Sequence, residues 1–455
     1  MNNNITPSIT LVGGGLVGSL SALLLAQRGF QVDVYERRAD MRLADISAGR
    51  SINLALANRG IFPLQQAGLM EQVKPLLTEM KGRMIHDTNG DCHLHPYGQK
   101  AHEVIYSVSR GDLNKLCLDA AEATGKVRFF FNQRCTKVDF ATNTIELEHS
   151  ETGSISETTF TRILGTDGSA SAVREAIHQN TSNYHKIEPL GHSYKELTIP
   201  PSTNGDFQME PYALHIWPRG GFMVIALPNR DKSFTVTLFM PNTGPVSFES
   251  IDSESKVKSF FEKEFPDAIP LLPNLMEEFF QNPTGHLATV RCSPWHYKDR
   301  ALLLGDAAHA IVPFHGQGMN CGFEDAWELI EQIDKHENDW EAIFKDTAEA
   351  RFDNGNAIAD MAIENYIEMR DSVNDPVFIL KKSLSFELEK RFPNHFVPRY
   401  SMVMFHRLPY AEAYRRGKIQ SIILDELVSN ISTLEDVDMS LAETLVKAKL
   451  NPIAL

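Results

Sequence analysis

Three glycines near the start of the chain, Gly13, Gly15 and Gly18, have the spacing G-x-G-x-x-G. Glycines at this spacing let the backbone turn tightly and approach a pyrophosphate at a helix N-terminus, where free N–H groups and the helix dipole favour negative charge. Glu36 follows about 20 residues later, where a carboxylate accepts hydrogen bonds from a ribose. The pattern predicts a dinucleotide whose adenosine lacks a 2′-phosphate, although a glycine-rich turn without a ligand stays open for this motif alone.

A second motif, D-G-x-x-S-x-x-R, runs from Asp167 to Arg174. We expect Asp167 and Gly168 to end a strand and to help close the nucleotide pocket. The alternative is a plain Asp-Gly turn before a helix that is capped by Ser169 or Ser171, since serine hydroxyls accept hydrogen bonds from the first N–H groups of a helix. The sequence alone leaves both interpretations open.

The third motif is the longest and the most specific. The apolar run Ala301–Leu304 leads into Gly305-Asp306, and the motif continues as far as Asn320. This order predicts a buried strand that delivers Asp306 to the start of a helix, where its carboxylate accepts a hydrogen bond from a polyol chain.

The second half of the third motif has the form P-x-x-G-Q-G-x-N, over residues 313–320. Gly316 and Gly318 lack side chains, so backbone N–H groups can come close to a ligand there. His309 and His315 have the chemistry of catalytic residues, but both lie inside the motif. We expect them to serve the geometry of its loop.

The first motif lies in a sequence that predicts a β-α-β unit. Residues 9–12 form a short apolar run, residues 19–27 have helical character until Gly29, and residues 31–35 predict a second strand. This is the order of elements in one half of a Rossmann fold.

Further along the chain, strand and helix patterns alternate. Residues 74–100 are strand-like, with a hairpin signal at Asn89-Gly90. Helical and antiparallel strand patterns then follow, and the last third of the chain is mostly helical, with breaks near four prolines. The expected elements are a helix at 110–123, strands at 127–131, 213–218, 222–227 and 234–240, hairpins within 137–160, and breaks near Pro376, Pro393, Pro398 and Pro409.

The composition is that of an ordinary water-soluble protein. The chain has 455 residues and a formal net charge of -15, which disfavours binding to nucleic acid or to an anionic membrane surface. The five cysteines are scattered without a C-x-x-C pair, as in a reduced cytosolic protein. The N-terminus lacks the features of a signal peptide, and no apolar stretch is long enough to span a bilayer. We therefore expect a cytoplasmic protein.

A cluster of potential metal ligands occurs at Cys92, His93 and His95. A structural zinc site normally needs four ligands, often as two pairs, and no second pair accompanies this cluster. We therefore expect no metal site.

The three motifs, in this order, resemble those of the class A FAD-dependent aromatic hydroxylases, the para-hydroxybenzoate hydroxylase-like family, over residues 1–330. The resemblance implies an α/β fold with a Rossmann-type FAD-binding domain, an interleaved β-sheet substrate domain and a helical C-terminal region. The expected FAD-binding domain comprises residues 1–73, 101–183 and 284–365, the substrate domain residues 74–100 and 184–283, and the helical region residues 366–455.

In this family NADPH reduces the bound FAD, which then adds O2 at C4a, and the hydroperoxide transfers OH to an electron-rich ring. The resemblance therefore implies FAD as cofactor and NADPH and O2 as co-substrates, without a catalytic side chain and without a metal. Some implied cofactor residues lie in the three motifs and others lie near the adenine, ribose or phosphates. The set is Gly13, Gly15, Leu16, Val17, Gly18, Glu36, Arg37, Arg38, Ala55, Arg110, Cys135, Asp167, Asp306, Gly318, Met319 and Asn320.

A narrower resemblance is to the kynurenine 3-monooxygenases, of the soluble bacterial type. It rests on strings with no role in a generic FAD fold, at residues 50–56, 81–86, 107–110, 214–218, 364–369 and 398–402. Eukaryotic members carry a hydrophobic C-terminal anchor, whereas this chain ends in the string KAKLNPIAL. The resemblance implies hydroxylation of L-kynurenine to 3-hydroxy-L-kynurenine, in tryptophan degradation or NAD biosynthesis, and leaves monomer and homodimer open.

The same resemblance implies a substrate site with a polar end and an apolar slot. Arg83 and Tyr97 would bind the amino-acid carboxylate, and Asn365 and Tyr400 would complete the polar end, because a guanidinium can grip a carboxylate in bidentate fashion. The apolar slot for the aromatic ring would consist of Met223, Ile225, Leu227, Phe239, Phe314 and Met369.

Other interpretations of these residues stay open. By pattern alone, Arg83 could form a surface salt bridge, and alternating apolar strand residues are more often core than pocket. Two other functions also stay open: an FAD monooxygenase acting on another aromatic acid or phenol, and a non-catalytic carrier or regulatory protein with an FAD-type fold.

Overall fold

The β-α-β unit predicted at the N-terminus is confirmed by the computed structural model, which describes residues 8–43, 53–182, 184–372 and 375–453. Strand β1 (Ser8–Val12), helix α1 (Leu16–Gln27) and strand β2 (Gln31–Tyr35) follow one another, and β1 pairs with β2 in parallel. Gly29, with a φ of +95°, follows the end of α1, where a left-handed conformation favours glycine.

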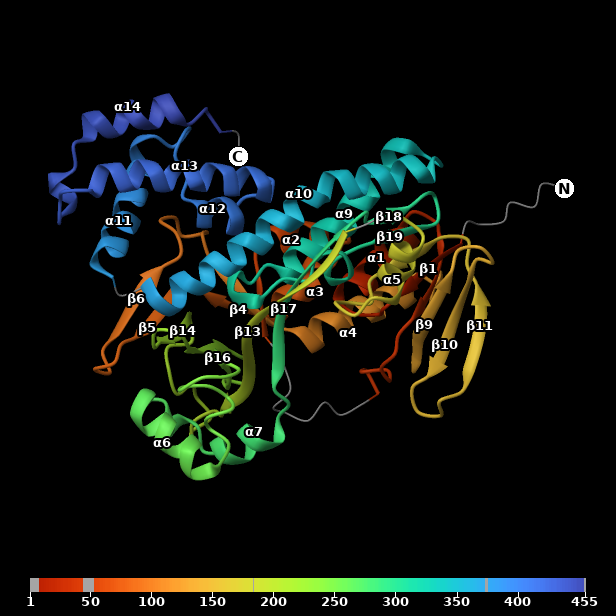
Figure 1. The fold of residues 1–455 in the computed structure, drawn as a ribbon, viewed down its shortest axis with the longest axis horizontal. Coiled ribbons are helices and arrows are strands. Elements are labelled where there is room, and N and C mark those ends of the chain that lie inside the picture. The colour runs from red at the N-terminus through yellow and green to blue at the C-terminus, as the bar shows by residue number, and fades with distance from the viewer. Residues whose placement is uncertain (1–7, 44–52, 183, 373–374, 454–455) are drawn as a thin grey trace. The chain divides into compact units, whose positions relative to one another are not determined.

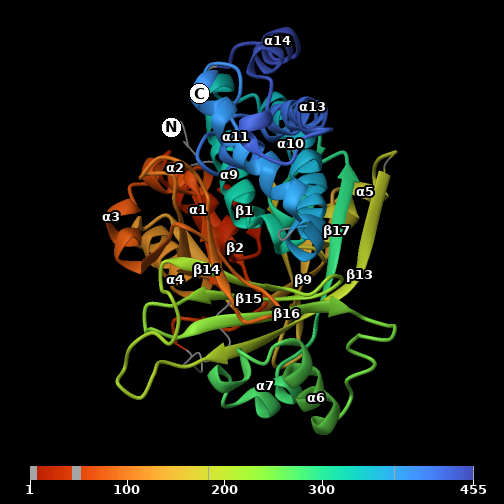
Figure 2. The same cartoon turned by 90° about the vertical axis from the view of Figure 1, so that its left-hand side faces the viewer.

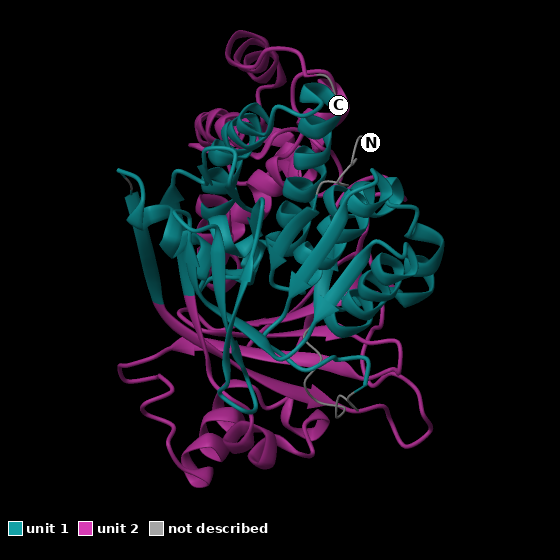
Figure 3. Ribbon diagram, turned by 90° about the vertical axis from the view of Figure 1, so that its right-hand side faces the viewer, with its two compact units in different colours: residues 1–77, 108–190, 288–359 teal, residues 78–107, 191–287, 360–455 magenta. Residues whose placement is uncertain are grey.

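The chain divides into two compact units, each assembled from three segments (Figure 3). Unit 1 comprises residues 1–77, 108–190 and 288–359, and unit 2 comprises residues 78–107, 191–287 and 360–455. Each unit is described by itself below.

Unit 1 is built on a six-stranded sheet with the order β18-β19-β12-β1-β2-β8. All neighbouring strands are parallel except the pair β18 and β19. The central strands are almost wholly buried, as expected for a parallel sheet with helices on both faces. The strands not yet defined are β8 (Val127–Phe130), β12 (Ile163–Gly165), β18 (His296–Tyr297) and β19 (Ala301–Leu303).

The helices of unit 1 include α1, which packs between α4 and α9 and is therefore buried on nearly all sides. The others are α2 (Asn58–Gln66), α3 (Met70–Val73), η1 (Lys74–Leu76), α4 (Arg110–Ala123), α5 (Ala172–Gln179), α8 (Asp306–His309), η3 (Pro313–His315), α9 (Gly318–His336) and the first part of α10 (Trp340–Ile367). The predicted helix at 110–123 and strand at 127–131 are confirmed, with the strand ending one residue earlier.

A separate antiparallel sheet of unit 1 contains β9 (Gln133–Asp139), β10 (Thr144–His149) and β11 (Ile155–Thr159), which lie side by side in Figure 1. The two hairpins predicted within residues 137–160 are therefore confirmed. Asn143 and Gly153, with φ values of +55° and +69°, form their turns.

Unit 2 contains most of a seven-stranded sheet with the order β17-β13-β16-β15-β14-β5-β6, of which residues 184–190 of β13 and 288–293 of β17 are counted with unit 1. The three strands predicted between residues 213 and 240 are confirmed as β14, β15 and β16, and the hairpin at Asn89-Gly90 as the turn between β5 and β6. The strands are β5 (Gly82–His86), β6 (Cys92–Pro96), β13 (Tyr184–Ile199), β14 (Ala213–Pro218), β15 (Met223–Pro228), β16 (Phe234–Pro241) and β17 (Gly285–Ser293).

One face of this sheet is covered by α6 (Glu254–Glu264) and α7 (Leu275–Gln281), as Figure 2 shows. Trp217, Val224 and Leu238 of the sheet belong to the same buried cluster as Phe261 of α6 and Phe279 of α7. The face that carries these side chains is thus the core face of unit 2.

The C-terminal part of unit 2 is helical, as predicted. After the end of α10 come the π-helical turn η4 (Glu368–Ser372), α11 (Pro376–Arg391), α12 (Arg399–Met404), α13 (Tyr410–Val428), η5 (Leu434–Asp436) and α14 (Met439–Lys449). Helices α11, α13 and α14 share a second buried cluster that includes Leu384, Ile423 and Val446. Three short strands, β3 (Asn53–Leu56), β4 (Leu77–Met80) and β7 (Ile105–Ser109), and η2 (Ile269–Leu271) complete the described elements.

Within the described residues, no helix is both long enough and apolar enough to cross a membrane.

Candidate active site

The glycines of the first motif are needed for two different reasons. Gly13 has a φ of +102°, and a Cβ there would lie 2.4 Å from the carbonyl oxygen of Thr166. A Cβ on Gly18 would lie only 2.0 Å from the carbonyl oxygen of Gly13. A Cβ on Gly15, in contrast, would meet nothing closer than Arg38 Nη2 at 3.8 Å. Gly13 and Gly18 therefore close the β-α-β turn, while Gly15 leaves open space at the N-terminus of α1, where a phosphate would approach.

Glu36, at the end of β2, is held in place as an ionised carboxylate. Its Oε2 accepts a hydrogen bond from Gly14 N at 2.7 Å, and its Oε1 accepts from Arg38 Nε at 2.7 Å. Burial raises the pKa of Glu36, but the hydrogen bonds and charge of Arg38 outweigh burial and lower the pKa overall. Arg37 and Arg38 are exposed beside it. A carboxylate and a cation at this position fit the ribose and phosphate of an adenosine.

Asp167 offers an unused acceptor in the second motif. Its Oδ2 accepts a hydrogen bond from Ala172 N at 2.7 Å, whereas its Oδ1 is buried and has no hydrogen-bond partner in the described part of the chain. Burial raises the pKa of Asp167. A buried carboxylate oxygen without a donor fits a hydroxyl or N–H group supplied by a ligand. Ser171 caps α5, so the capping interpretation of this motif is also confirmed.

Asp306 is the first residue of α8 in unit 1. Its side chain is exposed to solvent, yet the surrounding protein desolvates it enough to raise its pKa. The charges of His309 and Arg110 lower this pKa, so both residues lie near Asp306. Cys135 lies near Asp167, and burial raises the pKa of its thiol to about 12. Arg110 and Cys135, predicted from two distant segments, are thus close to two acidic side chains, Asp306 and Asp167.

Asn320 uses its side chain to hold two loops together. Its Nδ2 donates hydrogen bonds to the carbonyl oxygens of Ala55 and Gly316, both at 2.8 Å, and its Oδ1 accepts from Ala57 N at 3.0 Å. Both N–H donors of the amide are therefore engaged by protein. The contribution of Asn320 to a cofactor site goes through the positions of these loops.

The other predicted cofactor residues of unit 1 lie at helix starts. Leu16 and Val17 begin α1, and Val17 packs against Gly305, whose Cβ would lie 3.0 Å from it. Gly318 and Met319 begin α9, where Met319 is buried. Residues 50–52, part of one matching string, lie outside the described residues.

A buried ion network beside the third motif was only partly anticipated from the sequence. His309 was expected to serve loop geometry, but its partners Asp325 and Arg351 were not predicted. Asp325 Oδ2 lies 2.5 Å from His309 Nε2, and Asp325 Oδ1 accepts from Arg351 Nε at 2.7 Å. The available signal was Asp325 itself, an acidic residue two helical turns after Gly318 that has Cys321, Gly322 and Leu329 as neighbours on α9.

The predicted substrate residues on β15 and β16 share one face of the unit 2 sheet. Side chains alternate between the two faces along a strand, so Met223, Ile225 and Leu227 point the same way. Phe239 is the register partner of Met223 and shares that face. Val224, between them, lies in the core cluster with α6 and α7. The four predicted residues therefore occupy the face opposite α6 and α7.

Arg83 lies on the same face as these apolar residues. On β5 it is two residues before Ile85, whose register partner on β14 is Ile216. Ile216 is in turn the register partner of Ile225 on β15. The predicted polar end and most of the predicted apolar slot are thus brought together by strand register, without reference to any relative.

Arg83 is nearly buried and has polar and aromatic neighbours. Its Nη1 lies 3.2 Å from Glu368 Oε1, and its Nη2 donates to Asn365 Oδ1 at 3.3 Å. Its guanidinium carbon is 5.0 Å from the ring centre of Tyr400 and 5.9 Å from that of Tyr97. Its Nε is buried and has no hydrogen-bond partner among the described residues. The interpretation of Arg83 as a surface salt-bridge residue is wrong, and Glu368 is a partner that the sequence did not predict.

Tyr97 and Tyr400 are neutral phenols beside this guanidinium. Their rings stack at 5.4 Å with an interplanar angle of 12°. Burial raises the pKa of Tyr400 to about 12 and that of Tyr97 well above its ordinary value. Both hydroxyls therefore keep their protons near neutral pH and can donate hydrogen bonds to an anion.

Two further basic groups belong to this region. Burial and the charge of Arg83 lower the pKa of Lys382 to about 8, although Glu368 acts in the opposite direction. Burial, together with Lys382 and Arg83, lowers the pKa of His95 to about 4, so His95 is neutral. Two cations face one carboxylate, an arrangement that favours a ligand with a negative group.

The remaining predicted substrate residues are found in two places. Met369 lies on η4, and its sulfur is 3.1 Å from Asn365 Nδ2, so it belongs to the Arg83 surroundings. Phe314 lies on η3 of unit 1 and is buried there.

Cys92, His93 and His95 lie on β6, at the edge of the unit 2 sheet. With Asp87, Leu94 and Ile379 among its lining residues, this region forms an open depression of about 710 Å³. His93 and Cys92 are exposed.

With this geometry in view, the chain can be compared with known proteins. A family described as FAD binding domain matches residues 6–348. A protein from Myxococcus xanthus (strain DK1622) named kynurenine 3-monooxygenase is 48% identical over 98% of this chain and 96% of its own length. The chain belongs to the kynurenine 3-monooxygenase family and contains this FAD binding domain. It is therefore an FAD-dependent monooxygenase, as the sequence motifs predict.

Two more relatives carry the same name. One, from Xanthomonas oryzae pv. oryzae (strain KACC10331 / KXO85), is 46% identical over 99% of both chains. Another, from Stenotrophomonas maltophilia (strain K279a), is 44% identical over 97% of both chains.

Solved structures support the fold. The tetrameric form of 2-methyl-3-hydroxypyridine-5-carboxylic acid oxygenase covers 83% of this chain and 96% of its own, with a TM-score of 0.66 at 18% identity. Pseudomonas aeruginosa PqsL in complex with 2-aminobenzoylacetate covers 80% of this chain and 97% of its own, with a TM-score of 0.63 at 17% identity. At such low identity the likeness concerns the fold alone, and it confirms the predicted FAD-monooxygenase architecture.

Proposed function

We propose that this chain hydroxylates L-kynurenine at ring position 3, with NADPH and O2 as co-substrates, and forms 3-hydroxy-L-kynurenine. The observation that carries the proposal is the common face of the unit 2 sheet, where Arg83 and an apolar surface occur together. Kynurenine has an amino-acid carboxylate at one end and an aromatic ring at the other, which matches this pairing. The name shared by relatives over nearly the whole chain supports the same substrate.

At the polar end, Arg83 supplies the charge for the substrate carboxylate. Its Nε has no hydrogen-bond partner within the described residues, and its Nη1 lies 3.2 Å from Glu368 Oε1. A carboxylate that approaches this edge of the guanidinium can make charge-assisted hydrogen bonds with it. The phenols of Tyr97 and Tyr400 add neutral donors, and Asn365 holds the other end of the guanidinium.

Along the slot, Met223, Ile225, Leu227 and Phe239 offer an apolar surface to the aromatic ring. A mostly apolar pocket with a few fixed polar groups is the usual design of a small-molecule site. Met369 adds a flexible thioether that adapts to a ring edge. Phe314 is proposed for the same slot on the resemblance alone.

In unit 1 we propose that the space beside Gly15, the carboxylate of Glu36 and the acids Asp167 and Asp306 hold FAD. When bound, FAD supplies the redox chemistry, since it takes electrons from NADPH and activates O2. The protein's own residues bind, orient and exclude water, and no side chain is proposed as a catalytic acid or base. No metal is required.

The test is NADPH oxidation by the FAD-loaded protein with and without L-kynurenine, with product analysis by mass spectrometry. Fast oxidation only with kynurenine, together with a product that carries one added oxygen, is the expected result. Stimulated oxidation that yields only hydrogen peroxide would identify kynurenine as a mimic and direct attention to another aromatic acid or phenol. A protein that binds no FAD would instead support a carrier or regulatory function.

We also propose a cytoplasmic location. The five cysteines are free, and three of them are buried. Free thiols without disulfides are typical of a reducing compartment. Whether the protein is a monomer or a homodimer is tested by light scattering of the purified protein.

A further inference from the structure

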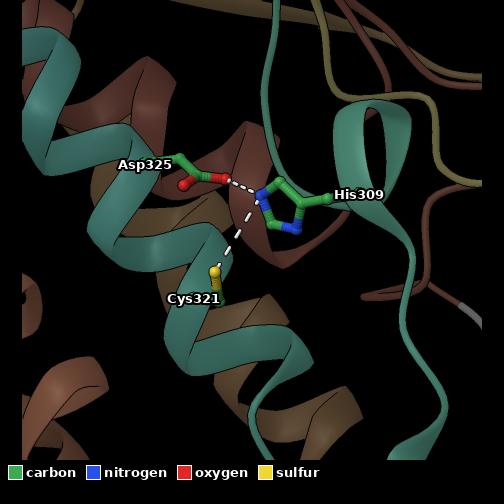
Figure 4. Close-up of side chains that lie close together, drawn as sticks. All are labelled: His309, Cys321 and Asp325. Carbon is green, nitrogen blue, oxygen red and sulfur yellow. Dashed lines mark hydrogen bonds and ion pairs between the residues drawn. The ribbon is translucent and has the colours of Figure 1, made fainter. Parts of the chain in front are cut away.

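Asp325 on α9 lies beneath the loop that precedes Asp306. The backbone N–H of Gly305 donates a hydrogen bond to Asp325 Oδ2 at 2.9 Å, and the same oxygen lies 2.5 Å from His309 Nε2. The other oxygen accepts from Arg351 Nε at 2.7 Å. Figure 4 shows Asp325 and Cys321 projecting from α9 toward the ring of His309. One carboxylate thus holds both ends of helix α8, which spans Asp306–His309.

The network is ionised. Burial alone would lower the pKa of His309, but the charge of Asp325 outweighs burial and raises this pKa well above its ordinary value. Burial alone would raise the pKa of Asp325, but His309 and Arg351 lower it. A second carboxylate, Glu324, lies between Arg351 and Arg59. Each buried charge therefore has an opposite partner, as a buried ion network requires.

His309, Cys321 and Asp325 also have the composition of a metal site, since their ligand atoms lie within 4.8 Å of one another. The guanidinium of Arg351 already occupies this place, however. Its Nη2 lies 3.2 Å from Cys321 Sγ while its Nε donates to Asp325. A metal ion would have to displace a buried guanidinium, so the cluster is better explained as an ion network with a structural task.

The backbone conformation of Gly305 indicates what this ion network stabilises. Its φ of +59° and ψ of -139° belong to a conformation that only glycine adopts readily. A loop in such a conformation needs external restraint, because the chain has many alternatives there. Asp325 restrains it directly through the Gly305 N–H, and indirectly through His309 at the other end of the short helix.

We propose that Asp325 is a positioning residue, which fixes Gly305 and His309 so that the carboxylate of Asp306 is directed toward the ribityl chain of FAD. The inference rests on the proposed role of Asp306 as a cofactor contact. It deepens that role by assigning the precision of this contact to a residue that does not itself touch the cofactor.

The experiment compares FAD and ADP binding to the apo full-length protein and three variants, Asp325→Asn, Asp306→Ala and Cys321→Ser. ADP contains only the half of FAD that meets Gly15 and Glu36. We expect Asp325→Asn and Asp306→Ala each to weaken FAD binding at least about tenfold, as for a lost charge-assisted hydrogen bond. ADP affinity should change by less than about twofold in both.

Cys321→Ser is the matched control. Cys321 contacts His309 and Arg351 but not Gly305, so this variant should bind both ligands like the wild type. If Asp325→Asn does not fold, Asp325→Glu serves instead, because it keeps the charge but displaces the carboxylate by one methylene. The same selective loss of FAD affinity is expected for it.

Three results would overturn the proposal. Equal loss of FAD and ADP affinity in the Asp325 variant would show a general structural role, and unchanged FAD affinity would show no role at all. Unchanged FAD affinity in Asp306→Ala would remove the cofactor contact on which the inference rests. None of these measurements uses kynurenine, so they are independent of the proposed substrate.

Discussion

At the scale of single residues, Arg83 is the side chain on which the proposed substrate recognition most depends. It is held ready by Glu368 and Asn365, with two phenol rings against the guanidinium. Such preorganisation reduces the entropy lost when a ligand binds. The carboxylate of Glu368 also contacts the guanidinium of Arg83 in the free protein. The carboxylate of an incoming substrate therefore competes with the carboxylate of Glu368.

Replacing Arg83 with alanine should therefore mainly raise KM for L-kynurenine. The loss of a charge-assisted hydrogen bond corresponds to roughly 1.5–3 kcal/mol in kcat/KM. Steady-state NADPH oxidation measures it, and Arg83→Lys, which keeps the charge without the planar fork, should recover only part of the loss. A KM like that of the wild type in Arg83→Ala would remove Arg83 from the site.

Lys382 is expected to give the proposed substrate site a pH dependence. Its pKa is lowered to about 8 by burial and by Arg83. Below about pH 8 the ammonium is charged and adds to the attraction for a carboxylate, and above this pH only Arg83 stays charged. KM for kynurenine should therefore rise as the pH increases through 8. In Lys382→Met, KM should be higher at pH 7 and should no longer rise in this range, and a rise of the same size in the variant would contradict the role of Lys382.

Some of these residues were predictable because their signal is local. Gly15, Glu36 and Asp306 belong to motifs in which the chain itself brings the chemistry together. Glu368 was not predictable, since its partner Arg83 is far away in the sequence and only the packing of η4 against the sheet brings them together. Asp325 was not predicted, because the backbone N–H of Gly305 that it holds lies 20 residues away in the sequence.

At the scale of secondary-structure elements, short strands with clear turn residues were predicted well. Strand β13 was not predicted, because Pro189 and Gly191 interrupt its sixteen residues and both residue types normally weaken a strand. Pairing with β16 along residues 192–199 stabilises it despite this local preference.

Helix α10 contains Gly355 at mid-helix, where a Cβ would lie 2.8 Å from Trp295 and 3.1 Å from His309. That glycine serves close packing, which sequence periodicity does not reveal.

The turn between β1 and α1 allows a matched pair of substitutions. Gly18→Ala places a Cβ 2.0 Å from the Gly13 carbonyl oxygen, so we expect the apo protein to lose about 1–3 kcal/mol of unfolding free energy through overpacking. Gly15→Ala meets no atom within 3.4 Å and should leave the stability of the apo protein nearly unchanged while weakening FAD binding. Urea unfolding and FAD titration measure the two effects. Equal destabilisation by both substitutions would contradict the division of roles between these glycines.

At the scale of the whole molecule, the chain passes repeatedly between two compact units, and each unit is assembled from three separate segments of the chain. The proposed cofactor residues lie in unit 1, whereas all proposed substrate residues except Phe314 lie in unit 2. The resemblance to a known family implied this kind of discontinuous organisation, but composition and periodicity did not. Contacts between segments that are far apart in sequence define the units, and no local pattern encodes such contacts.

Because the proposed cofactor residues of unit 1 include separate groups for the two halves of FAD, cofactor binding should stabilise the whole chain in a graded way. A ligand that binds only the folded state adds about 2.7 kcal/mol of stability at a concentration of 100 times Kd. Thermal unfolding of the apo protein should therefore shift upward with FAD, less with ADP and least with FMN, which lacks the adenosine half. Glu36→Ala should reduce the shifts with FAD and ADP but leave that with FMN unchanged. A shift with FMN as large as that with FAD would contradict the assignment of Gly15 and Glu36 to the adenosine half, since FMN carries no group that reaches Glu36.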